Sequence, residues 1–240
     1  MTTPALVAVA HGTRTPSGPD TIEALMAQVR RRLPMADVHT SYVELNEPLF
    51  SDVMAAQRGP TVVVPLLLSS GYHTNHDLPE MAKAAQGPVR IARPLGPHPL
   101  LAAMMCHRLQ AAGARRGDAV VMVAAGSRDS DALVDTLAMG RLLQAHWGAP
   151  VQVAQLSGSG QHVNEAVESL WAQGHRRIAA APYLLAPGYF ARKARAQATV
   201  AGCAAVADVL GSHRMVAELV ARRYLAMAMT GAVADTTRVA

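Results

Sequence analysis

Short apolar runs alternate with longer segments of helical periodicity along this chain. The run from Ala5 to Ala10 is continuously apolar, which is typical of a parallel strand buried on both faces. From Asp20 to Leu33 the apolar residues recur every three or four positions, as on one face of a helix, and Pro34 ends the pattern. In the first half, strands are predicted at residues 5–10, 38–45, 61–67 and 89–92, and helices at 20–33, 47–56, 78–85 and 99–112. This order predicts an α/β fold in which helices cover both faces of a parallel sheet.

Three motifs of the first half recur in the second half, in the same order and about 114 to 117 positions later. They are LVAVAHGTR (6–14) with VVMVAAGSR (120–128), VPLLLSSGY (64–72) with APYLLAPGY (181–189), and LGPH (95–98) with LGSH (210–213). Three matches in register indicate an internal duplication. We predict two tandem parallel-sheet α/β domains, residues 1–116 and 117–240, related by a pseudo-two-fold axis. The segment from Thr230 has no periodicity, so it is expected to be frayed.

Composition narrows the class of protein. Half of the 240 residues are hydrophobic, which is ample for a core and excludes a disordered chain. Two cysteines, Cys106 and Cys203, are too few for a disulfide-stapled scaffold. The longest apolar runs are far short of a membrane span, and no basic segment precedes the apolar run near the N-terminus. We therefore expect a cytoplasmic protein that does not contact a membrane.

The chain is basic, with a formal net charge of +5 and a pI of about 9.7, which favours an anionic partner. Nucleic acid is not the expected partner, because the basic residues are scattered and few aromatic residues could stack on bases. No helix-turn-helix or zinc-finger spacing occurs either. The charge leaves two interpretations open, an acidic small molecule or a solvated basic surface.

The duplication separates shared features from features of one half. His11 follows the first strand, and its counterpart is Ala125; His73 follows the third strand, and its counterpart is Phe190. Glu44, at the end of the second predicted strand, aligns with the stretch LSGSG, which has no carboxylate. Ligands of open α/β sheets bind at the carboxyl ends of strands, where these three side chains are expected to converge. They could bind a divalent first-row metal with coordination positions left open, or they could accept protons.

Other histidines point less clearly to chemistry. His76 lies in the same loop as His73 and is interpreted as an auxiliary ligand or a solvated side chain. His98 and His213 open the last helix of each half, which favours a role at the helix start or between the domains. The chain has no CxxC, P-loop, GxGxxG or GxSxG motif, so the common zinc, nucleotide and serine-hydrolase signals are absent.

The motifs HGTR, VEL-NEP and PLLLxxGYH, together with the duplication, resemble the sirohydrochlorin chelatases in their long, two-domain form. These are metal chelatases of tetrapyrrole synthesis that need no energy-consuming subunits. The resemblance covers nearly the whole chain. It implies a chelatase-like fold with one active site, in the N-terminal half, and a degenerate copy in the C-terminal half. It also implies insertion of Fe(II) into sirohydrochlorin, with His11 and His73 as metal-handling and catalytic histidines and Glu44 as the nearby carboxylate.

The same resemblance implies a polyanionic tetrapyrrole as partner, a divalent metal as substrate, and no permanently bound cofactor. Arg14 and the run containing Arg192, Lys193 and Arg195 are the expected contacts to the macrocycle's carboxylates, with a solvated helix face as the alternative for the latter three. A monomer is expected, since one chain supplies both domains. Two alternative functions stay open: a cobaltochelatase acting on the same macrocycle, and a non-catalytic metal or tetrapyrrole carrier.

Overall fold

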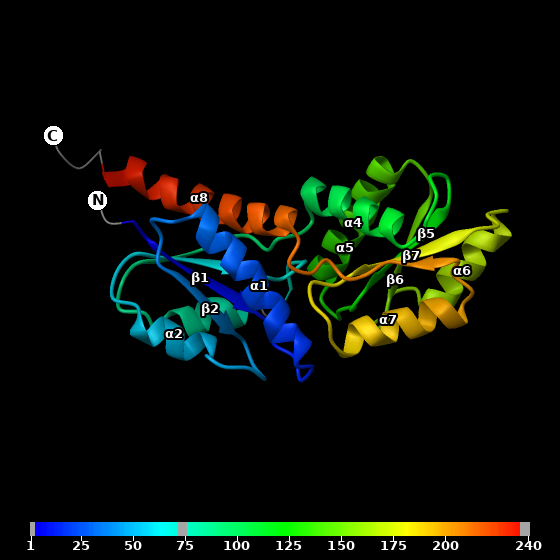
Figure 1. The fold of residues 1–240 in the computed structure, drawn as a ribbon. Coiled ribbons are helices and arrows are strands. Elements are labelled where there is room, and N and C mark those ends of the chain that lie inside the picture. Colours follow the sequence, from blue (N-terminus) through cyan, green and yellow to red (C-terminus); the bar gives the residue numbers. More distant parts are fainter. Residues whose placement is uncertain (1–2, 72–75, 236–240) are drawn as a thin grey trace.

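The computed structural model describes residues 3–71 and 76–235, which form two four-stranded parallel sheets side by side (Figure 1). The strand orders are β2-β1-β3-β4 and β6-β5-β7-β8, so the second half repeats the topology of the first. The first half contains β1 (Ala5–Ala10), α1 (Ser17–Arg32), β2 (Val38–Tyr42), α2 (Phe50–Ala56), β3 (Thr61–Pro65), α3 (Leu78–Ala82), β4 (Val89–Ile91) and α4 (Pro99–Ala111). The second half contains β5 (Ala119–Ala124), α5 (Ser130–Trp147), β6 (Val151–Gln155), α6 (Val163–Ala172), β7 (Ile178–Tyr183), α7 (Tyr189–Val200), β8 (Ala205–Val206) and α8 (Arg214–Asp235). The predicted fold class and duplication are confirmed.

Several boundaries differ from the sequence prediction, including the two on either side of residues 43–49. The second strand ends at Tyr42 instead of Leu45, and α2 begins at Phe50, because residues 43–49 form a loop that turns back along the sheet edge. The segment predicted to be frayed begins at Thr230, but α8 continues to Asp235, so the prediction is wrong for these six residues; the rest of the segment lies outside the described residues. Neither α8 nor any other helix in the described ranges is long and apolar enough to cross a membrane.

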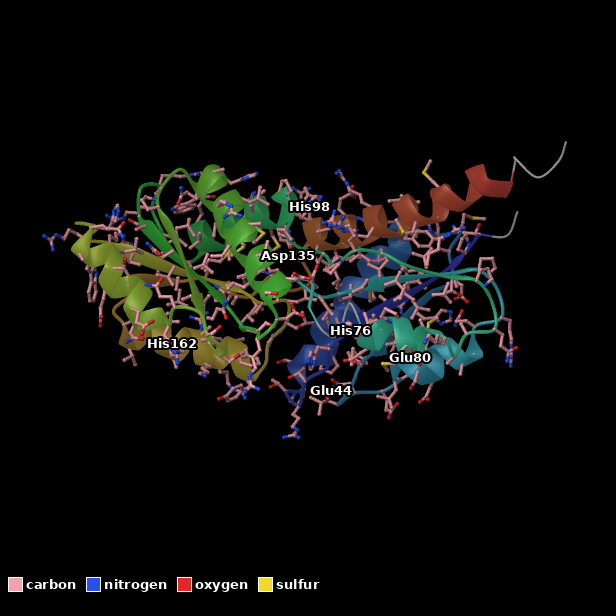
Figure 2. The ribbon with its side chains drawn as sticks, turned by 180° about the vertical axis from the view of Figure 1, so that it is seen from behind. Glu44, His76, Glu80, His98, Asp135 and His162 are labelled. Carbon is pink, nitrogen blue, oxygen red and sulfur yellow. The ribbon has the colours of Figure 1, made fainter. Side chains whose placement is uncertain are left out.

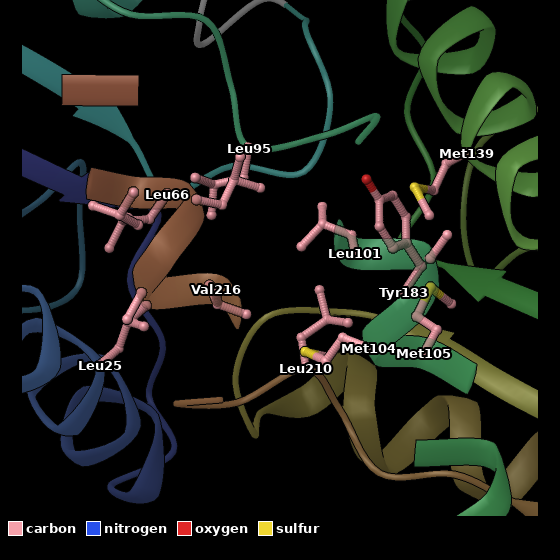
Figure 3. Close-up of a cluster of buried hydrophobic side chains, with 14 of the residues drawn as sticks. Leu25, Leu66, Leu95, Leu101, Met104, Met105, Met139, Tyr183, Leu210 and Val216 are labelled. Atoms are coloured by element: carbon pink, nitrogen blue, oxygen red, sulfur yellow. The ribbon is translucent and has the colours of Figure 1, made fainter. Parts of the chain in front are cut away.

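The alternation of side chains along each strand divides the core into layers. In β1, Leu6 and Ala8 face a large apolar cluster, whereas Val7 and Val9 face a smaller one beneath α2 and α3. The second sheet is built the same way, with its own smaller cluster beneath α6 and α7. The large cluster is continuous across both halves; Figure 3 shows leucine and methionine side chains from both halves packed around Tyr183. Burial of these apolar side chains holds the two sheets together.

The last helix of each repeat packs on the other repeat. Helix α4 follows the first sheet in sequence but lies against α5 and β7 of the second, and α8 lies against α1 and β3 of the first (Figure 1). This exchange of helices is reciprocal, and one pair of equivalent hydrogen bonds shows it. Arg108 on α4 donates to the carbonyl of Leu210 at 3.1 Å, and Arg223 on α8 donates to the carbonyl of Leu95 at 3.3 Å. This reciprocity supports the pseudo-two-fold relationship.

The two shared histidines are helix caps. The Nδ1 atom of His98 accepts a hydrogen bond from the backbone N–H of Leu100 at 3.1 Å, at the start of α4. The Nδ1 atom of His213 accepts one from Met215 at 3.2 Å, at the start of α8. Each imidazole satisfies an N–H group that the first helical turn leaves unpaired. The sequence prediction of a helix-start role is therefore confirmed.

Candidate functional site

A cleft of about 910 Å³ separates the carboxyl ends of the two sheets. One wall is formed by the loops that follow β1, β2 and β3, and the other by the loops that follow β5 and β7 together with the start of α5. In Figure 2, Glu44 marks the first wall and Asp135, on α5, belongs to the second half. The position is the one at which ligands bind in open α/β sheets, and its size suits a large organic molecule.

His11 and Glu44 meet on the first wall. Strands β1 and β2 are parallel with Ala10 opposite Tyr42, so the next residues leave the sheet side by side. The N–H of Glu44 donates to the carbonyl of His11 at 3.1 Å, and the His11 Nδ1 lies 3.4 Å from the Glu44 Oε1. The two side chains are 46% and 54% exposed. An imidazole and a carboxylate are thus presented together to the cleft, at a distance that lets both contact one ion or proton.

Gly12 makes this close approach possible. Its φ is +104°, and a Cβ atom at this position would lie 1.9 Å from the backbone oxygen of Glu44. Any side chain would therefore push the two loops apart. The side chain of Asn46 adds a further tie, since its Oδ1 accepts a hydrogen bond from the N–H of Thr13 at 2.7 Å. The chemistry of His11 and Glu44 thus depends on a glycine beside them.

The second half keeps this turn but not its chemistry. Gly126 has a φ of +92°, and its added Cβ would lie 1.8 Å from the backbone oxygen of Ser157. Ala125 and Ser157 therefore occupy the backbone positions of His11 and Glu44. The Ser157 hydroxyl donates to the carbonyl of Ala125 at 2.7 Å and so bonds to the neighbouring loop, after β5. Both potential metal donors are confined to the first half at this pair of positions.

His73 lies outside the described residues, so its predicted place beside His11 stays a prediction. In the described ranges, no group of three or more His, Cys, Asp or Glu side chains is arranged to hold a metal ion. His11 and Glu44 are the two predicted metal-binding residues that the structure brings together. His76, the first described residue after the gap, is exposed near the start of α3 (Figure 2).

The second half holds the loop that leads toward His73. The N–H of Ser70 donates to the Asp135 Oδ2 at 2.7 Å, and the Tyr183 hydroxyl donates to the carbonyl of Leu68 at 2.7 Å. Burial, with the Asp135 carboxylate nearby, raises the pKa of Tyr183 well above its usual value, so the phenol remains a donor. Neither Asp135 nor Tyr183 was predicted from the sequence to hold this loop. Asp135 lies in an ordinary helical segment, and nothing in the sequence marks it.

The predicted basic residues separate into two groups. Arg14 and Arg192 line the cleft, and the Arg192 Nη1 donates to the Thr15 Oγ1 at 3.0 Å across the two halves. Lys193 and Arg195 are absent from the cleft wall, which corrects the prediction that they face it. The Lys193 ammonium donates to the carbonyl of Leu156 at 2.7 Å, and Arg195 pairs with Asp208 at 2.7 Å. Lys193 points about 100° away from Arg192 around the helix, whereas Arg195 lies almost a full turn further along α7, beyond the residues that line the cleft.

Comparison with known proteins assigns the family. The CbiX family model matches residues 5–112 and again residues 119–226. The chain belongs to the CbiX family. The "Sirohydrochlorin ferrochelatase" of Bacillus subtilis is 31% identical over 150 residues, which cover 58% of each chain. The "Sirohydrochlorin cobaltochelatase" of Methanococcoides burtonii is 27% identical over 120 residues, 43% of this chain and 92% of its own.

A solved structure extends the likeness to the whole fold of this CbiX-family chain. "SirB from Bacillus subtilis with Fe3+" superposes with a TM-score of 0.78 at 23% identity, covering 93% of this chain and 95% of that one. At this identity the match shows the shared fold. Together with the two family-model matches, it accounts for both repeats and for their arrangement as two parallel-sheet domains.

Proposed function

We propose that this protein is a sirohydrochlorin ferrochelatase, a lyase that inserts Fe(II) into sirohydrochlorin to form sirohaem. The observation that carries the proposal is the pairing of His11 with Glu44 on one wall of a large cleft. Its counterpart in the second half has the same backbone turn with Ala125 and Ser157 in their places. Membership of the CbiX family and the B. subtilis relative support the same activity.

The chemistry of insertion suits these side chains. A divalent ion that enters the macrocycle displaces two pyrrole N–H protons, so the site must deliver a metal and accept protons. A neutral imidazole can hold the ion through one ring nitrogen and later take up a proton. The Glu44 carboxylate can do the same, and its partial exposure lets the ion leave for the macrocycle. We assign His73 as a further metal ligand and catalytic histidine, on the evidence of its GYH motif.

The remainder of the cleft would hold the macrocycle. Arg14 and Arg192, one from each half, can pair with its carboxylates at the edge of the cleft. Because one chain supplies both walls, we propose that the monomer is sufficient, with no nucleic acid or membrane partner and no resident cofactor. We place it in the cytoplasm, since its two cysteines form no disulfide.

Cobalt insertion into the same macrocycle is the second candidate. The M. burtonii relative carries that name, and imidazole and carboxylate ligands discriminate little between Fe(II) and Co(II). Parallel assays with the two metals under anaerobic conditions decide between them through the ratio of kcat/KM values. A carrier differs from both enzymes, because it would change the absorbance of sirohydrochlorin only in stoichiometric amounts.

The test is metal insertion followed by the absorbance of sirohydrochlorin over many turnovers. The wild type should complete many turnovers, and His11→Ala and Glu44→Gln should each lower kcat by about 100-fold, the usual size of an acid–base contribution. His146→Ala is the matched control, because that histidine caps its own helix turn and does not line the cleft. Full activity in His11→Ala, or a wild type that stops after one equivalent, would contradict the proposal.

A further inference from the structure

Large hydrophobic side chains are exposed on both walls of the cleft. Leu45 is 49% exposed on the first wall, and Tyr189 and Phe190 are 62% and 38% exposed on the second. The three residues come from the loop after β2 and from the start of α7. Exposed apolar side chains that face each other across a cleft indicate a ligand with an apolar surface.

The conformation of Leu45 shows that the fold does not demand a leucine there. Its φ is +67°, and among the described residues it is the one non-glycine with a positive φ. The corresponding residue of the second half is Gly158, which follows Ser157 and has a φ of +87°. The backbone at this position thus favours glycine, and asparagine is the side chain that tolerates it next best. A leucine held in a strained conformation with half its surface in the cleft points to a role in binding.

Tyr189 and Phe190 are held in place relative to the first wall. Their rings pack edge to face, with centroids 5.4 Å apart and planes at 70°. The helix they begin is pinned to the loop after β1, because Arg192 donates to Thr15 and a Cβ on Gly188 would lie 3.2 Å from the Thr13 Oγ1. The two rings therefore form a defined surface opposite the His11 wall.

The residues that replace the histidines in the second repeat are apolar, and Phe190 is one of them. It stands where the first repeat has His73, so the second repeat has an aromatic ring in place of an imidazole. Ala125, in place of His11, likewise removes a polar group. At these positions the second wall presents apolar groups where the first repeat has histidines. The cleft is therefore asymmetric, with polar donors on one wall and aromatic rings on the other.

We infer that Leu45, Tyr189 and Phe190 form the contact surface for the apolar faces of the tetrapyrrole ring, an inference that rests on the proposed function. The ring is flat and conjugated, and its carboxylates lie on its edge. Contact between its faces and these side chains would leave the carboxylates to Arg14 and Arg192. It would also direct the central nitrogens toward the wall that carries His11 and Glu44.

Binding of metal-free sirohydrochlorin, followed by its own absorbance, tests the inference without metal insertion. Leu45→Asn keeps a residue that tolerates the backbone conformation and removes the apolar contact. We expect it to raise the dissociation constant about fivefold, and the double substitution Tyr189→Ala with Phe190→Ala to raise it about tenfold or more, in line with measured aromatic contacts. KM for the macrocycle should rise in parallel, with kcat little changed.

Trp171→Ala is the matched control, because that ring is 43% exposed on α6 and does not line the cleft. It should bind sirohydrochlorin as the wild type does. Leu45→Asn should unfold at the same temperature as the wild type or a higher one, which separates lost contact from lost folding. Wild-type affinity in both cleft variants would overturn this inference alone, whereas a wild type that binds no sirohydrochlorin would overturn the proposed function with it.

Discussion

Replacing Gly12 by alanine should lower both the stability of the protein and the metal affinity of the proposed His11–Glu44 site. The residue has a φ of +104°, and holding alanine in such a conformation costs about 1 kcal/mol. The new Cβ would lie 1.9 Å from the Glu44 backbone oxygen, so the two loops must separate by more than about 1 Å to restore van der Waals contact. That movement breaks the 3.1 Å hydrogen bond from the Glu44 N–H to His11, worth about 1 kcal/mol. With the remaining displacement of the loops, we expect a loss of about 3 kcal/mol in the free energy of unfolding.

Two other glycines separate the conformational from the steric contribution to this loss of stability. Gly113 has a φ of +86° with open space around its added Cβ, so Gly113→Ala should lose about 1 kcal/mol through conformation alone. Gly126→Ala meets the Ser157 oxygen at 1.8 Å and should lose as much as Gly12→Ala. It leaves His11 and Glu44 where they are, so its affinity for a divalent ion should stay close to that of the wild type.

Urea unfolding of the three variants gives the free energies, and a Co(II) titration without macrocycle gives the metal affinity. The expected order of stability places Gly113→Ala above the other two. Only Gly12→Ala should also lose metal affinity. A Gly12→Ala protein as stable as Gly113→Ala would refute the steric argument, and one that binds Co(II) normally would refute the dependence of the His11–Glu44 pair on this turn.

Two further predictions concern protonation and charge. Burial and nearby arginines lower the pKa of His98 and of His213 below 6.5, so the folded state favours the neutral imidazoles that cap their helices. Their stabilisation is complete above pH 6.5 and declines as the pH falls below it, and replacing both by Asn, which caps at any pH, should flatten the fall in melting temperature between pH 7 and 5. An unchanged dependence of the melting temperature on pH would contradict this. Arg192→Ala should raise KM for sirohydrochlorin a few-fold at low salt and less at high salt, since the charge is exposed and screened. A KM equal to that of the wild type at low salt would show that Arg192 is a solvated side chain with no role in binding.

Much of the fold follows from local pattern. The strand at Ala5–Ala10 is found with the predicted bounds, because six apolar residues between polar segments leave little choice of structure. The duplication also points to the candidate site, since His11 and Glu44 have no counterparts and the parallel register of β1 and β2 brings them together. These features depend on residues close in sequence or on adjacent strands.

The features that the sequence did not reveal depend on long-range packing. Arg192, Lys193 and Arg195 were all expected to face the cleft. Lys193 instead donates to the carbonyl of Leu156 and Arg195 pairs with Asp208, and these partners become neighbours only in the folded chain. The strained conformation of Leu45 could not be predicted either, because leucine rarely adopts a positive φ and so does not mark a left-handed turn in a sequence. Asp135 acquires its role only when α5 reaches the loop at Ser70.

Because α4 and α8 each pack on the opposite repeat, the two repeats cannot be separated by a simple cut between them. If the chain were cut between residues 116 and 117, each piece would carry a helix that belongs on the other sheet and would leave the large apolar cluster exposed. The two polypeptides would then associate to bury that cluster, as copies do in domain swapping. Each four-stranded sheet of this chain therefore depends on the other repeat for one of the helices that cover it.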